Sequence, residues 1–209
     1  MSISLEEAYQ QTAQEAYDKE LIEHALKEIS YDAMSHYLWE YGHAIQTRIK
    51  DCLKSATDLY KGKYYGPSIV CSCTAVEITI RYFILSPLMQ GAFLSDEWAA
   101  LLTERIVSGA AAKDRKTLPS ILKFWGIDIN NIKLSSGEPL WQYLHECIWK
   151  ARNKYVHQGN PVSRGLSSKA IKAATRMEKL ANDVLVRALN WKKGQHRFGS
   201  TKHGKSPFI

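Results

Sequence analysis

The chain has 209 residues, with 28 Lys or Arg against 21 Asp or Glu, so its formal net charge is +7. This length predicts one domain with a tail, and the 45% apolar and 23% charged composition argues against global disorder. Polar residues interrupt the most apolar stretch (69–85), and residues 1–11 carry two acids and no base. We therefore expect no membrane span, no secretory signal and a cytoplasmic location.

The first half of the chain predicts helices. Residues 5–29 are rich in helix-favouring Glu, Gln, Ala, Leu and Lys. Residues 32–61 carry an apolar or aromatic residue every three or four positions, which predicts a long amphipathic helix. Residues 67–87 are ambiguous because their β-branched residues alternate as in a strand. Nineteen residues without a turn exceed the usual strand limit of about ten, so we expect a buried helix.

The second half continues this pattern. Short helices are predicted at 95–108 and 117–125, another over 139–159, and a last one over 167–191. No strand pattern or internal repeat is found, so the expected fold class is all-α. We expect an N-terminal helical extension (1–31), a helical domain (32–193) and a basic tail (194–209). Five prolines are expected to mark the boundaries of these segments: Pro67, Pro87, Pro119, Pro139 and Pro161.

Most of the net positive charge lies at the C-terminus. No acid follows Asp183, whereas residues 184–209 contain six Lys or Arg. Such an arm is suited to phosphate backbones or acidic partners, which makes Lys192, Lys193 and Arg197 candidate substrate-binding residues. A solvated arm that binds nothing is the alternative.

The cysteines and histidines do not predict a metal site. Cys52, Cys71, Cys73 and Cys147 lack the spacing of zinc ligands or of a disulfide framework. Among the histidines, only the pair at 36 and 43 shares a helix face, two turns apart, which is too far for one metal ion without other ligands. We expect reduced thiols, no metal and no cofactor.

One polar stretch, residues 150–159, ends the helix predicted from residue 139. Within it, Asn153 and His157 are four residues apart and share a helix face, and the long side chain of Arg152 can reach the same space. An imidazole can take the proton of a ribose 2′-hydroxyl or give one to the leaving 5′-oxygen. A guanidinium can stabilise the added negative charge on phosphate, and Asn153 can orient the His or bind phosphate. These residue types fit RNA cleavage without a metal.

The Arg152-Asn153-x-x-x-His157 pattern resembles the Arg-x(4–6)-His motif, with a polar second residue, of the HEPN superfamily. The resemblance covers about residues 35–190. It implies a helical bundle with long antiparallel helices and a homodimer in which two motifs form one composite site. It also implies a metal-independent endoribonuclease, acting as a toxin or antiviral defence effector, whose partners are RNA and an antitoxin or defence-system protein. Many such toxins carry a modified Tyr two residues after the His, but Gly159 occupies that place here, so this neutralisation is not expected.

The resemblance also indicates supporting residues. Glu77 is the only acid between Asp58 and Asp96 and lies in an otherwise apolar helix, so it needs a partner. In the HEPN arrangement this helix packs beside the motif helix, which makes Arg152 one candidate partner. Arg81, four residues on, is the other.

Three further residues flank or lie within the motif. Lys150 and Lys154 are candidates to bind RNA, although solvated charges on a helix face are the usual interpretation. Tyr155 is expected to be a packing residue.

Two other functions are compatible with the sequence. A catalytically idle HEPN-like module would bind nucleic acid, nucleotide or a partner protein. A helical interaction protein would use its aromatic stripes as a subunit interface. The complete set of Arg152, Asn153 and His157 favours the enzyme, because an idle module has no chemical need for it.

Overall fold

The computed structural model describes residues 31–92, 94–108 and 114–189. Within these ranges every regular element is a helix, and a single isolated β-bridge pairs Lys133 with Pro139. This confirms the predicted all-α class. The expected tail (194–209) and, apart from Tyr31, the expected N-terminal extension (1–31) lie outside the described residues.

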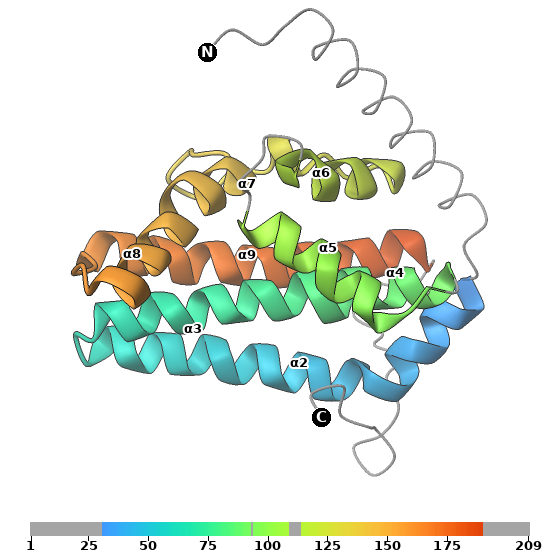
Figure 1. The fold of residues 1–209 in the computed structure, drawn as a ribbon, viewed down its shortest axis with the longest axis horizontal. Coiled ribbons are helices and arrows are strands. Elements are labelled where there is room, and N and C mark those ends of the chain that lie inside the picture. The colour runs from blue at the N-terminus through green and yellow to red at the C-terminus, as the bar shows by residue number, and fades with distance from the viewer. Residues whose placement is uncertain (1–30, 93, 109–113, 190–209) are drawn as a thin grey trace, which may run out of the picture.

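Long helices pack side by side along the bundle (Figure 1). α2 (Tyr31–Lys61) turns back into α3 (Tyr65–Ile78), so these two helices are antiparallel, and α9 (Arg164–Ala188) packs against both. The apolar periodicity predicted for 32–61 explains α2, because its repeating side chains face the core. Those buried are Met34, Tyr37, Leu38, Ile45, Ile49 and Ala56.

The ambiguous segment around residues 67–87 is helical, as expected from its length. α3 continues through a π-helical stretch, η1 (Thr79–Leu85), into α4 (Ser86–Gly91). By length and composition this segment of 27 residues meets the criteria for a membrane span. However, 67% of its apolar window is buried inside the fold, as in the core helix of a globular domain.

Shorter helices cover the other side of the bundle (Figure 1). They are α5 (Asp96–Ser108), α6 (Asp114–Phe124), the 3-10 turn η2 (Ile129–Asn131), α7 (Leu140–Tyr143), the π-helical stretch η3 (Leu144–Trp149) and α8 (Lys150–Gln158). The last three form one continuous helical segment, which confirms the helix predicted over 139–159.

One of the five prolines, Pro119, does not mark a boundary, so that part of the prediction was wrong. Pro87 lies near the start of α4, directly after the π-helical stretch, where the altered hydrogen-bond register accommodates a residue without an N–H. Pro119 lies inside α6. It cannot donate to the carbonyl of Arg115, four residues earlier, and that carbonyl instead accepts from Nε1 of Trp141 at 2.7 Å. A distant side chain thus satisfies the acceptor that the proline leaves free.

Buried hydroxyls fix the long helices at one end of the bundle. Ser68 Oγ of α3 donates to the carbonyl of Ala56 in α2 at 2.8 Å, and Ser167 Oγ of α9 donates to Ser68 Oγ at 2.9 Å. Because all three helices are joined here, this end is a fixed support for α8, which lies against it.

Candidate active site

The end of α8 is set by a glycine. Gly159 has φ 69°, in the left-handed region that other residues adopt only with strain. Its N–H donates to the carbonyl of Tyr155 at 3.0 Å, and that of Asn160 donates to the carbonyl of Lys154 at 3.3 Å. These bonds close the last helical turn. His157 lies in this turn, exposed to solvent.

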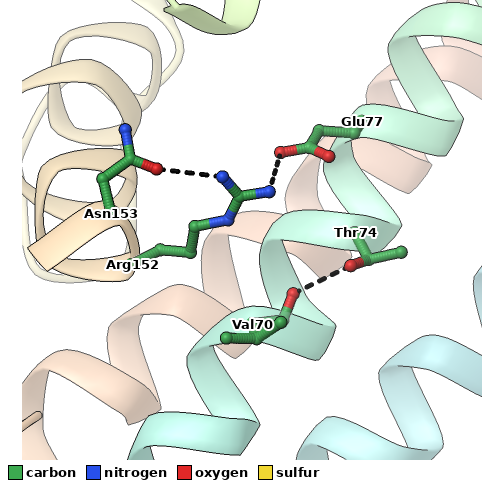
Figure 2. Close-up of polar contacts among 5 residues, drawn as sticks. All are labelled: Val70, Thr74, Glu77, Arg152 and Asn153. Atoms are coloured by element: carbon green, nitrogen blue, oxygen red, sulfur yellow. Dashed lines mark hydrogen bonds and ion pairs between the residues drawn. The ribbon is translucent and has the colours of Figure 1, made fainter. Parts of the chain in front are cut away.

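Arg152 joins α8 to α3 through Glu77. Its Nη2 lies 3.2 Å from Oε1 of Glu77, and its Nη1 donates to Oδ1 of Asn153 at 2.9 Å (Figure 2). Of the two partners considered for Glu77, the structure thus selects Arg152. Arg81 instead places its guanidinium 4.8 Å from the ring centre of Tyr82.

The Glu77–Arg152 pair is only partly open to solvent. The two side chains are 26% and 27% exposed. Burial raises the pKa of Glu77, and the guanidinium of Arg152 opposes that rise. Nε of Arg152 is buried and has no hydrogen-bond partner among the described residues. The guanidinium is therefore held on two sides, while the N–H groups of Nη1 and Nη2 not used in these bonds can still donate.

Asn153 binds the arginine of the motif in this structure. The sequence predicted that it orients His157 or binds phosphate, but its Oδ1 accepts from Arg152. Asn153 and His157 are four residues apart on α8, so they share a face. The bond to Asn153 thus links the Arg152 guanidinium to a residue on the face that carries His157. Sequence reasoning missed this role, although hydrogen-bonding neighbours in the chain could have suggested it.

Tyr155 is a packing residue, as predicted. Its ring lies so close to Gly66 that a Cβ added there would be 2.2 Å from Cε2. Only a glycine on α3 allows this approach. The contact presses α8 against the start of α3.

The other candidate residues have different outcomes. Lys150 and Lys154 are exposed on α8, whereas the candidates of the basic tail lie outside the described residues (Lys192, Lys193 and Arg197). All four cysteines are free thiols, and burial raises the pKa of Cys73. In the described ranges, no group of three His, Cys, Asp or Glu could hold a metal ion.

Comparisons with known proteins do not identify the chain. No family model matches it, and no curated protein or solved structure does so.

Proposed function

We propose that this protein is a metal-independent endoribonuclease of the HEPN type, cleaving RNA by attack of a ribose 2′-hydroxyl on the adjacent phosphate. The observation that carries the proposal is the guanidinium of Arg152, held between Glu77 and Asn153 on the helix whose last turn exposes His157. A fixed cation and a solvent-accessible imidazole on one helix are the minimum such a reaction needs.

In this reaction the 2′-oxygen forms a bond to phosphorus while the bond from phosphorus to the 5′-oxygen breaks. A general base removes the 2′-hydroxyl proton, and a general acid protonates the leaving 5′-oxygen. The products are a 2′,3′-cyclic phosphate and a free 5′-hydroxyl. The unused N–H groups of Arg152 stabilise the negative charge of the non-bridging oxygens in the transition state.

The His157 imidazole of one chain cannot be both base and acid in the same step. We therefore include a homodimer in the proposal, with His157 of one protomer as the base and that of its partner as the acid. A cytoplasmic toxin or defence effector is the corresponding biological role, with an antitoxin or defence-system protein as partner.

The test incubates the purified full chain with a labelled RNA in EDTA. Wild type should produce 2′,3′-cyclic phosphate ends, and His157→Ala and Arg152→Ala should each lower the rate by about 100-fold or more. His36→Ala is the matched control, because His36 is also exposed but lies on α2. Cleavage of a 2′-deoxy substrate at a comparable rate would contradict the mechanism. RNA binding without cleavage would favour the idle module instead.

A further inference from the structure

The end of the bundle that carries α8 is rich in positive charge and poor in acids. Residues 59–76 and 147–177 contain no Asp or Glu. The turn from α2 to α3, the end of α8 and the start of α9 all lie at this end (Figure 1), so the two acid-free segments meet there. The same segments contain nine basic residues: Lys61, Lys63, Lys150, Arg152, Lys154, Arg164, Lys169, Lys172 and Arg176.

The acids that reach this end are already engaged. Glu77 binds Arg152, Glu138 binds Lys169, and Asp58 in the last turn of α2 binds Lys54 at 2.9 Å. By contrast, the lysines of the α2–α3 turn and of α8 form no ion pair with any residue the structure describes; these are Lys61, Lys63, Lys150 and Lys154. Their charges are available to an anionic partner.

An aromatic ring is displayed among these cations. Tyr64, in the turn between α2 and α3, is 64% exposed. Three backbone hydrogen bonds hold the turn, from the N–H groups of residues 62, 63 and 64 to carbonyls of the last turns of α2. Lys63 has φ 66°, a costly conformation for a non-glycine residue that persists where the surroundings enforce it. Tyr64 is thus an exposed side chain on a fixed backbone.

The turn also lies next to the candidate active site. Gly66, two residues after Tyr64, is the contact point of Tyr155, which precedes His157 by two residues. On the α9 side, Nε of Arg164 donates to the hydroxyl of Tyr60 at 3.2 Å, and the rings of Tyr60 and Tyr65 are 5.7 Å apart. Cations and aromatic rings therefore alternate across one end of the molecule.

We propose that this surface, formed by Lys61, Lys63, Tyr64, Lys154 and Arg164, binds the single-stranded RNA that flanks the scissile phosphate. Tyr64 stacks on an unpaired base, and the four cations bind backbone phosphates. A single strand is favoured over a duplex because paired bases are stacked on one another and offer no free face to the ring. This inference rests on the proposed function for its choice of ligand.

Binding is measured by fluorescence anisotropy with a labelled unstructured RNA oligonucleotide, using the full-length His157→Ala protein as the non-cleaving parent. Adding Tyr64→Ala should weaken binding about 5-fold or more, whereas Tyr64→Phe, which keeps the ring, should bind like the parent. Adding Lys61→Gln and Lys63→Gln should lower the slope of log K against log salt by about 1.4. Lys116→Gln with Lys123→Gln is the matched control, since it removes two exposed charges on α6; its slope should stay that of the parent. Circular dichroism checks that each variant is folded.

Either of two results overturns the inference. One is that Tyr64→Ala binds as tightly as the parent, and the other is that the Lys61/Lys63 variant keeps the slope of its control. Cleavage by the wild-type protein is measured separately. A protein that shows these binding effects but does not cleave RNA would contradict the proposed function and leave this surface supported. A protein that cleaves RNA but shows neither binding effect would contradict this surface alone.

Discussion

At the scale of single residues, Glu77 combines an electrostatic cost with a positional role. Burial raises its folded-state pKa above the ordinary value of 4.5. As pH rises past 4.5, the unfolded chain releases this proton first, so the folded state loses relative stability until pH exceeds the raised pKa. Above that range, ionised Glu77 lowers the stability of the fold while it holds Arg152.

Glu77→Gln should therefore separate stability from activity. The amide keeps an oxygen for Arg152 but removes the buried charge, so at neutral pH the melting temperature should equal or exceed that of wild type. Cleavage should fall about 10- to 100-fold, because the guanidinium is held less firmly. Thermal melts and kcat/KM on one RNA measure the two effects. Unchanged kcat/KM would remove Glu77 from the site.

Glu138→Gln is the control for this experiment. Glu138 binds Lys169, and this contact lowers the pKa of its carboxyl group to about 2. The fold therefore favours the ionised form of Glu138, whereas it disfavours the ionised form of Glu77. This control should not gain stability at neutral pH, and its cleavage rate should be that of wild type.

His145 makes the stability of the fold sensitive to acid. Its ring lies edge-on between Trp141 and Trp149, with centroids 4.5 and 4.6 Å away. Burial, assisted by the charge of Arg115, lowers its pKa to about 4. As pH falls from about 6.5 to about 4, the unfolded chain binds a proton at His145 that the folded chain does not. The free energy of unfolding therefore decreases over this range by up to about 3 kcal/mol.

His145→Phe keeps an aromatic ring but cannot titrate. Urea unfolding at about pH 7 and about pH 4.5 should show a smaller loss of unfolding free energy for this variant than for wild type. An equal loss in both proteins would show that other groups cause the acid sensitivity.

At the scale of elements, a hydrogen bond joins α6 to α7 at the carbonyl that Pro119 leaves without a helical donor. The carbonyl of Arg115 accepts from Trp141 Nε1, since Pro119 has no N–H. Trp141→Phe should cost about 1–3 kcal/mol, partly because this carbonyl loses its donor. Adding Pro119→Ala restores a backbone N–H at the normal helical spacing and should recover part of that loss. A double-mutant cycle by urea unfolding measures the coupling, and additive effects would contradict this link.

At the scale of the whole molecule, the helices were predictable because their signal is local. The apolar period over 32–61 corresponds to α2 (Tyr31–Lys61), and the helix expected at 95–108 is α5 (Asp96–Ser108). Pro119 was misjudged for a long-range reason. Whether Pro119 ends a helix depends on Trp141, which supplies a donor from 26 residues away in the sequence.

In the candidate site, too, the residues that are close in sequence were predictable and the distant partners were not. Arg152, Asn153 and His157 lie within six positions on one helix, so their spacing alone grouped them. The partner of Glu77 stayed undecided because Arg152 is 75 residues away and Arg81 only four. Among the cations around Tyr64, the sequence singled out only Lys154. Lys61, Lys63 and Arg164 were overlooked because the surface combines two acid-free segments that only the fold brings together.

The basic tail supplies most of the net positive charge of the molecule, and its sequence alone supports a test. Six of the seven net positive charges lie in residues 184–209. A chain that ends before Lys193 loses four of them, namely Lys193, Arg197, Lys202 and Lys205. With about 0.7 counterions released per phosphate contact on a single strand, the salt slope of RNA binding should fall by up to about 3 if all four bind RNA.

Cleavage at saturating RNA should change little in this truncated chain, because Arg152, Asn153 and His157 are retained. Its urea midpoint should also match that of the full chain, since we do not expect a charged arm with three glycines and few apolar residues to cover a core face. The measurement repeats the anisotropy titration at several salt concentrations on the His157→Ala background. An unchanged slope would mean that the tail does not bind RNA. Weaker binding of a partner protein, with that slope unchanged, would assign the tail to a protein contact instead.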